Sequence, residues 1–190
     1  MIISAAILAG GENSRMDGKN KALLEIADET LLQKQIRILS DFFDDIFVVG
    51  KGIPQSYKVD LVSDIFPESG PLSGIHSALC FSKTDYVFVV SCDMPFLSPE
   101  LIELMISEIK KNPCEALVPR HSKGIEPLHS FYNKSIIEKA EIMLRKKDFR
   151  IRKIYKNINV SYFDVTLVPE KIFFNINYPC DMIKAQSYFK

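Results

Sequence analysis

The sequence lacks an excess of charge of either sign. Its 190 residues include 24 lysines and arginines and 24 aspartates and glutamates, so the formal net charge is zero. A protein without net charge has no overall field to draw it to nucleic acid or to an anionic membrane surface. We therefore expect neither among its partners, and any phosphate site has to be built from local groups.

Paired cysteines are also missing. Cys80, Cys92, Cys114 and Cys180 are widely spaced and form no C-x-x-C pair. This spacing argues against a structural zinc site and against a disulfide framework. Reduced, partly buried cysteines of this kind are typical of a cytoplasmic protein.

Long hydrophobic runs are absent as well. The apolar segment at the start of the chain stops far short of the ~20 residues that a membrane span needs, and it lacks the basic region of a secretion signal. We therefore expect a cytoplasmic protein. Apolar residues make up 47% of the chain, enough for a sizeable core, and no repeat or linker divides it. These features predict one domain over residues 1–190.

Strand-like and helix-like segments alternate along most of the chain. Such alternation predicts a three-layer α/β fold, with a mostly parallel central sheet and helices on both faces. Ligands of such folds lie outside the carboxyl ends of the strands. The expected strands are residues 2–8, 45–50, 59–64, 85–93, 115–120, 126–133 and 173–177. The expected helices are residues 30–43, 70–82, 98–111, 134–147, 150–158 and 178–189, with Thr30 and Ser98 as N-caps.

Neither of the two best-known phosphate loops is present. A Walker A loop has four residues between its first glycine and the Gly-Lys pair, whereas six separate Gly11 from Gly18. The dinucleotide pattern G-x-G-x-x-G also fails, because Gly10 and Gly11 are adjacent. What is present is a strand that runs into two glycines, whose backbone N–H groups can surround an anion, followed by Arg15 and Lys21. The alternative is an ordinary turn with exposed cations.

A second polar segment follows the expected strand at residues 59–64. Asp64 ends that strand, and Gly70, Pro71 and Gly74 stand at the start of the next helix. The N-terminus of a helix offers unpaired N–H groups, and glycines let a base or ribose approach the backbone. A plain loop before a helix is the competing interpretation.

Acidic and amide side chains follow two later segments. Asp93 comes directly after the strongest strand of the sequence, where a carboxylate suits Mg²⁺ bound to nucleotide phosphates. Asn175 and Asn177, two residues apart in an expected strand, share one face and can complete a magnesium shell. The alternatives are a turn-forming aspartate and the end of an edge strand.

Four motifs together resemble the molybdenum cofactor guanylyltransferase family. They are LAGGENSRMDGKNK, GPLSGI, DMPF and NINYP, and the resemblance covers nearly the full length. It implies a Rossmann-like nucleotidyltransferase fold. It further implies that GTP is bound by Leu8, Ala9, Gly10, Gly11, Lys21, Asp64, Gly74 and Asp93, that Asp93 also binds Mg²⁺, and that Arg15, Asn175 and Asn177 lie in the same site.

The resemblance also implies a reaction. The phosphomonoester of molybdenum-molybdopterin attacks the α-phosphorus of GTP, pyrophosphate leaves, and molybdopterin guanine dinucleotide forms, with Arg15, Lys21 and Asp93 as the catalytic residues. Transient contacts with cofactor-biosynthesis proteins and recipient molybdoenzymes are expected from the same resemblance. Three alternatives remain: a cytidylyltransferase for the same pterin, a guanylyltransferase for another phosphorylated cofactor, and a nucleotide-binding carrier module without catalysis.

The sequence departs from the family at several positions. Asp17 replaces a glycine, Asn20 replaces an aspartate before the lysine, and Tyr178 and Cys180 replace the commoner threonine and glutamate. The family's polar residue after the second strand is not evident in VVGKGIP, which puts that base or ribose contact in doubt.

Histidines are not expected to act as catalysts, because a phosphomonoester is already an anion near pH 7. His76, His121 and His129 are predicted to be helix-surface or strand residues, and His129 is the best candidate for a pterin contact. Residues 145–153, RKKDFRIRK, are predicted to be a solvated helix face that could also guide an anionic cofactor or a recipient enzyme.

Overall fold

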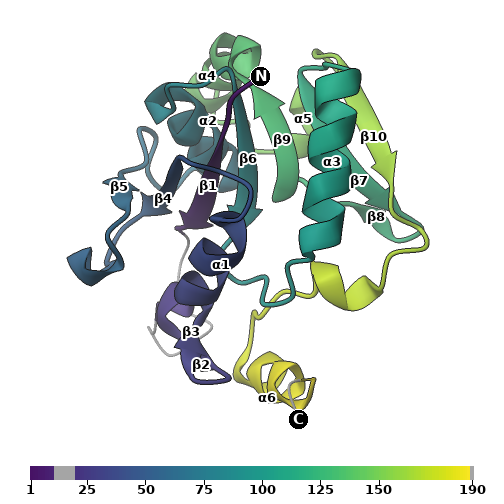
Figure 1. The fold of residues 1–190 in the computed structure, drawn as a ribbon. Helices are drawn as coiled ribbons and strands as arrows, with labels where there is room; N and C mark the ends of the chain where they lie inside the picture. Colours follow the sequence, from purple (N-terminus) through teal and green to yellow (C-terminus); the bar gives the residue numbers. More distant parts are fainter. Residues whose placement is uncertain (11–19, 189–190) are drawn as a thin grey trace.

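The computed structural model of the protein describes residues 1–10 and 20–188. Its centre is one large sheet, crossed by strands in the order β10-β7-β9-β6-β1-β4-β5, with β8 paired to β7 (Figure 1). The strands are β1 (Ile3–Ala9), β4 (Ile46–Gly50), β5 (Asp60–Val62), β6 (Tyr86–Ser91), β7 (Ala116–His121), β8 (Gly124–Ile125), β9 (His129–Asn133) and β10 (Val160–Asp164). A separate small hairpin joins β2 (Glu25–Ile26) to β3 (Glu29–Thr30).

The pairing is mostly parallel, as the sequence predicts. β6, β1, β4 and β5 pair in parallel, and so do β10 and β7, whereas β9 is antiparallel to both β6 and β7. The carboxyl ends of β1 and β6 consequently meet at one edge of the sheet. In Figure 1 this edge faces the end of the molecule that holds β2, β3 and the last helix.

Helices cover both faces of the sheet and complete the three predicted layers. One face buries side chains of α1 and α3, and the other buries side chains of α2, α4 and α5. The helices are α1 (Leu31–Leu39), α2 (Pro71–Phe81), α3 (Pro99–Lys111), α4 (Ile137–Arg145), α5 (Ile151–Ile154) and α6 (Pro179–Ser187). Short 3-10 helices are η2 (Lys21–Leu23), η3 (Gln55–Tyr57), η4 (Lys134–Ile136) and η5 (Glu170–Phe173). Thr30 and Ser98 cap α1 and α3 as expected.

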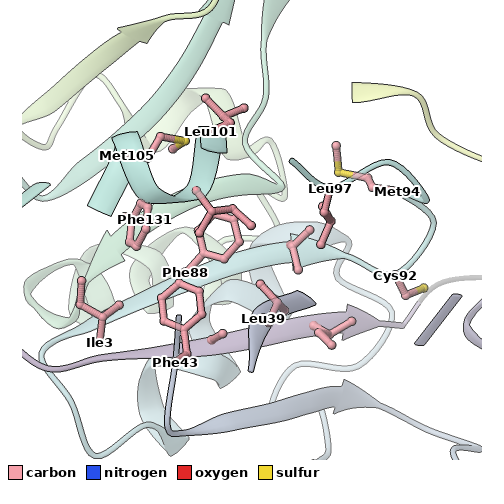
Figure 2. Close-up of a cluster of buried hydrophobic side chains, with 14 of the residues drawn as sticks. Ile3, Leu39, Phe43, Phe88, Cys92, Met94, Leu97, Leu101, Met105 and Phe131 are labelled. Atoms are coloured by element: carbon pink, nitrogen blue, oxygen red, sulfur yellow. The ribbon is translucent and has the colours of Figure 1, made fainter. Parts of the chain in front are cut away.

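Residues of the central strands alternate between the two cores. Phe88 and Val90 of β6 point to the α1–α3 side, whereas Val87 and Val89 point to the other side. This period of two is the geometric signature of a strand that is buried on both faces. Figure 2 shows the α1–α3 side, where the Phe43 ring stacks on Phe88 at 5.6 Å between centroids and Phe88 contacts Phe131 at 4.9 Å.

The prediction of a strand at residues 173–177 is wrong. The 3-10 helix η5 ends at Phe173, and the next residues form a loop. The loop bonds to the turn after β6, where Ile176 N–H donates to the Asp93 carbonyl at 2.9 Å. The edge position beside β7 is taken instead by β10, which the sequence analysis did not predict. The helix expected at residues 150–158 is also shorter, and only Ile151–Ile154 is helical.

The basic segment, residues 145–153, is not a continuous solvated helix face. α4 ends at Arg145 and α5 begins at Ile151, with a turn between them. Asp148 accepts from Arg150 at 2.8 Å and from Lys153 at 2.6 Å, so two of the six cations of the segment are paired within it.

Two other features agree with the sequence. All four cysteines are free thiols, with Cys92 and Cys114 buried and Cys80 and Cys180 exposed. In the part of the chain that the structure describes, every helix is too short or too polar to cross a bilayer.

Candidate active site

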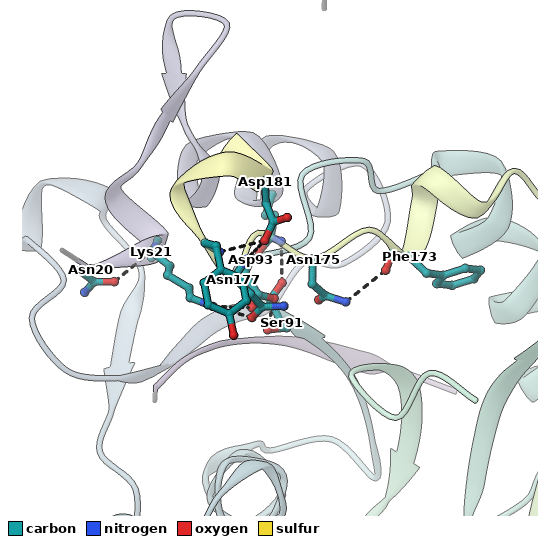
Figure 3. Close-up of polar contacts among 11 residues, drawn as sticks. Asn20, Lys21, Ser91, Asp93, Phe173, Asn175, Asn177 and Asp181 are labelled. Carbon is teal, nitrogen blue, oxygen red and sulfur yellow. Dashed lines mark hydrogen bonds and ion pairs between the residues drawn. The ribbon is translucent and has the colours of Figure 1, made fainter. Parts of the chain in front are cut away.

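The centre of the candidate site is an ion pair between Lys21 and Asp93. Lys21 Nζ donates to Asp93 Oδ2 at 3.2 Å and to Asn177 Oδ1 at 2.9 Å (Figure 3). These residues come from η2, from the turn after β6 and from the loop before α6. Three segments far apart in the sequence therefore meet at the carboxyl edge of the sheet, where sequence analysis expects a ligand.

Two side chains that sequence reasoning missed hold Asp93 in place. Ser91 Oγ donates to Asp93 Oδ1 at 2.6 Å. Gln35 of α1 donates to the carbonyl of Ser91 at 2.8 Å and to that of Met94 at 3.0 Å, which fixes the turn that carries Asp93. The serine two residues before the aspartate is a signal that the sequence contained, because Ser and Asp at this spacing commonly bond in a turn.

Asn20 positions Lys21. Its Oδ1 accepts from the N–H of Ala22 at 3.1 Å and so caps η2. Its Nδ2 donates to the carbonyls of Lys51 at 3.3 Å and Gly52 at 3.4 Å, which ties η2 to the loop after β4. An aspartate at this position could cap the helix but could not donate to the two carbonyls, so the departure from the family pattern has a structural role.

The loop before α6 carries the two asparagines. Asp181 accepts from the backbone N–H groups of Asn177 and Tyr178, both at 2.9 Å, and thereby fixes Asn177 against Lys21. Asn175 Nδ2 donates to the Phe173 carbonyl at 3.1 Å. The two asparagines line the same cavity despite the loss of the expected strand, because the loop is extended around buried Ile176.

A small cavity of about 160 Å³ lies on one side of this centre. Four predicted nucleotide contacts line it, namely Leu8, Gly10, Asp64 and Gly74. The two glycines, Gly10 and Gly74, let neighbouring side chains of the cavity wall approach their backbone closely. A β-carbon at position 74 would lie 3.0 Å from Leu8 Cδ1, and one at position 10 would lie 3.3 Å from Asp64 Oδ2.

Asp64 faces the small cavity from the loop after β5. Its Oδ1 accepts from Ser73 Oγ of α2 at 3.1 Å. Burial raises the pKa of this carboxyl, and the Ser73 hydrogen bond opposes the shift. A partly buried carboxylate that faces a cavity is a suitable acceptor for ribose hydroxyl or base N–H groups.

The side chain of the predicted site residue Ala9 packs into the α1–α3 core, so only its backbone can reach a ligand. The predicted site residues Gly11 and Arg15, and also Asp17, lie outside the described residues.

A larger cavity of about 450 Å³ is lined by Asn177, the hydrogen-bond partner of Lys21. Asn177 and Asn175 line it together with residues of β7, η5 and α6 and of the loops that follow β7, β8 and β10. Sequence analysis did not find this cavity, because its walls come from segments without a recognisable motif. Its lining includes His121, Lys123, Glu126, Lys171, Phe173, Phe174, Lys184 and Tyr188.

The prediction that His129 contacts a pterin is wrong. His129 lies in β9 beneath the larger cavity, is fully buried, and packs edge-on against Phe88 at 5.2 Å and Phe173 at 5.5 Å. His121 is the histidine that lines the cavity, with Nε2 2.8 Å from Glu126 Oε1. His76 is buried in α2, so it is not a surface residue.

His129 is expected to make the protein less stable in acid. Burial lowers its pKa from an ordinary value near 6.5 to about 4. The unfolded chain therefore takes up a proton near pH 6.5 while the folded protein does not, and stability is lost as the pH falls toward 4. We expect a loss of about 2 kcal/mol from this residue between pH 7 and pH 5, measured by urea unfolding at both values.

The matched variant for this measurement is His129→Leu, which suits the apolar neighbours. Its unfolding free energy should fall by less between pH 7 and pH 5, because the titrating group is gone. Within the described residues neither ring nitrogen of His129 has a hydrogen-bond partner, so the variant should be at least as stable as wild type at pH 7. An equal pH dependence in the two proteins would contradict the assignment.

A complete metal shell is not built by protein side chains alone. The described residues contain no group of three histidine, cysteine, aspartate or glutamate side chains placed to hold a metal ion. Mg²⁺, however, is commonly bound by one or two carboxylates together with substrate phosphates and water. Asp93, with the amide oxygen of Asn177 beside it, fits that pattern.

Comparison with known proteins supports the family that the sequence motifs resemble. Residues 5–162 match the model of the MobA-like NTP transferase domain. A probable molybdenum cofactor guanylyltransferase of Pelotomaculum thermopropionicum is 34% identical over 96% of this chain and 91% of its own length. One of Clostridium perfringens is 36% identical over 88% of this chain and 93% of its own length.

A solved structure is similar over nearly the whole chain. It is molybdopterin-guanine dinucleotide biosynthesis protein A of Archaeoglobus fulgidus, which is 27% identical, with a TM-score of 0.84 and coverage of 98% of both chains. The fold is thus the Rossmann-like nucleotidyltransferase fold that the resemblance implies. From its motifs, its sheet topology and these relatives, the chain belongs to the molybdenum cofactor guanylyltransferase family and is a nucleotidyltransferase.

Proposed function

We propose that this enzyme transfers GMP from GTP to the terminal phosphate of molybdenum-molybdopterin. The observation that carries the proposal is a pair of cavities, each lined by a hydrogen-bond partner of the Lys21–Asp93 pair. Ser91, which bonds to Asp93, lines the smaller one, and Asn177, which bonds to Lys21, lines the larger one. A transfer between two bound substrates needs this arrangement, because both have to reach the same phosphorus.

The reaction forms one P–O bond and breaks another. An oxygen of the acceptor phosphomonoester attacks the α-phosphorus of GTP, and the bond from that phosphorus to the oxygen leading to the β-phosphate breaks. Pyrophosphate leaves with the electron pair. The acceptor already carries about 1.5 to 2 negative charges near pH 7, so it needs no general base.

The residues of the site act by binding and by neutralising charge. Lys21 is positioned by Asn20 and Asp93 to donate to the phosphates of GTP, and Asn177 holds its ammonium group from the acceptor side. Leu8, Gly10, Asp64 and Gly74 surround the nucleoside part in the smaller cavity. Arg15 and Gly11 are proposed as further phosphate contacts because of their place in the family motif.

Mg²⁺ is proposed as the cofactor. Asp93 would hold it, with the amide oxygens of Asn177 and Asn175 nearby and the phosphate oxygens of GTP as the other ligands. When bound, the ion would neutralise charge on the transferring phosphate and orient it.

Pyrophosphate release tests the proposal. Purified enzyme, molybdenum-molybdopterin and Mg²⁺ are combined with GTP or with CTP, and pyrophosphate and the dinucleotide product are measured. We expect turnover with GTP and little with CTP. Turnover with CTP alone would assign a cytidylyltransferase instead, and GTP turnover with another phosphorylated cofactor but not with this pterin would assign a different acceptor.

A carrier module without catalysis is the remaining alternative. It would bind GTP but release no pyrophosphate under any of these conditions. The ion pair between Lys21 and Asp93, held by Ser91 and Asn177, supports an enzyme, because simple nucleotide binding does not require an ion pair whose partners line two cavities.

A further inference from the structure

We infer that the larger cavity binds the acceptor of the transfer, a phosphorylated planar heterocycle, and that Lys184 and Lys171 bind its phosphate. This inference rests on the proposed function, since it assigns the second substrate to a place. The larger cavity has a volume of about 450 Å³, which is within the usual range for a small-molecule site.

The position of the cavity supports an acceptor. Asn175 and Asn177 line it, and Asn177 accepts from Lys21 at 2.9 Å. The predicted nucleoside contacts Gly10 and Asp64 line the other cavity. A molecule in the larger cavity would therefore lie next to Lys21 while leaving the predicted nucleoside contacts free for GTP.

Unpaired positive charge marks where an anion would bind. Lys123 is paired with Glu170 at 2.6 Å, and His121 is paired with Glu126 at 2.8 Å. Lys171 and Lys184 also line the cavity, and neither forms an ion pair with a carboxylate in the part of the chain that the structure describes. Two ammonium groups without a carboxylate partner suit a phosphomonoester that is close to a dianion at pH 7.

Aromatic rings hold these lysines at the cavity wall. Lys184 Nζ lies 5.3 Å from the centre of the Phe174 ring, and Lys171 Nζ lies 6.0 Å from that of Tyr188. Phe174 directly precedes Asn175, so Lys184 is placed near the asparagines that line the cavity. The acceptor phosphate would thus lie between Lys184 and the asparagines, next to Lys21 and Asp93.

Flat side chains further out suit a fused heterocycle. The His121 ring stacks on Phe173, with 5.6 Å between centroids and 22° between planes. Glu126, paired with His121, can accept from the adjacent amino and ring N–H groups of an amino-pyrimidinone edge. Aromatic surface, a carboxylate and the two lysines together match a pterin monophosphate better than a second nucleoside triphosphate, whose charge would exceed that of the two lysines.

Binding of 6-hydroxymethylpterin monophosphate tests the inference without any catalytic step. Its intrinsic fluorescence anisotropy is titrated with wild-type enzyme, Lys184→Met and Lys171→Met. We expect each variant to bind about 10- to 100-fold more weakly, the effect of losing one charge-assisted hydrogen bond. The phosphate-free compound 6-hydroxymethylpterin should bind to wild type and to Lys184→Met with equal affinity, because its phosphate contact is missing in both.

The control is Lys83→Met, which removes the same charge from an exposed position in the turn before β6, at the end of that strand opposite to Asp93. It should bind the probe as wild type does, and calorimetric GTP binding should be unchanged in all three variants. No saturable binding to wild type, or equal affinity in wild type, Lys184→Met and Lys171→Met, would overturn the inference. Failure of GTP turnover with intact probe binding would refute the proposed function and leave the binding site standing.

Discussion

Replacing Asp93 by asparagine is expected to lower the turnover number with GTP by at least about 10²- to 10³-fold. The amide keeps the size of the side chain and an acceptor for Ser91, but it removes the negative charge that pairs with Lys21 and that is proposed to hold Mg²⁺. We expect the unfolding free energy to change by about 1 kcal/mol, because the amide oxygen can still accept from Ser91 and only the bond from Lys21 to the second oxygen is lost. Pyrophosphate release and urea unfolding measure the two effects.

Asp85→Asn is the matched control for this variant. Asp85 is exposed and stands just before β6, at the end of the strand opposite to Asp93, so its change alters the same charge away from the site. It should turn over GTP as wild type does. Full activity in Asp93→Asn, or an equal loss in both variants, would show that the carboxylate of Asp93 does not act in the transfer.

Replacing Lys21 by alanine is expected to weaken GTP binding by about 1.5 to 3 kcal/mol, or roughly 10- to 150-fold. The reason is the loss of a charged donor that the structure holds at the edge of the sheet through Asn20, Asp93 and Asn177. Isothermal calorimetry with GTP and Mg²⁺ measures the change. Turnover should fall as well, since the same donor is proposed to act on the phosphates during transfer.

Lys83→Ala serves as the control for this second variant. Lys83 is exposed in the turn before β6, at the opposite edge of the sheet. Its GTP affinity should equal that of wild type. If Lys21→Ala binds GTP with wild-type affinity, the lysine serves only to neutralise Asp93, and the phosphates must be held elsewhere.

Local patterns predicted most of the fold. Apolar strands such as residues 85–93 pack on both faces and have to be buried, and capping residues such as Thr30 determine where helices begin whatever surrounds them. The prediction was wrong at residues 173–177, where an apolar and amide run looks like a strand. At the edge of the sheet, β10 pairs with β7. The local sequence pattern carries no information on which segment takes that position.

The candidate site, like the fold, could be predicted from the sequence only in part. Asp93 and Asp64 were found because each follows a strand, and the motifs around Lys21 and Asn177 are specific. Ser91 was missed because it was taken as part of the strand. The placement of His129 was wrong because strand pairing, which the sequence does not show, decides whether a histidine faces a cavity or the core.

By itself, the sequence determined the fold class, the order of most elements and the segments that carry the chemistry of nucleotidyl transfer. These properties follow from hydrophobic period, capping residues and short motifs, all of which act over a few neighbouring residues. Only the tertiary structure decided that Lys21 bonds to both Asp93 and Asn177, across separations of 72 and 156 residues, and that Lys171 and Lys184 line a second cavity next to Asn177. Such contacts depend on how distant segments are brought together, and no local rule contains that information.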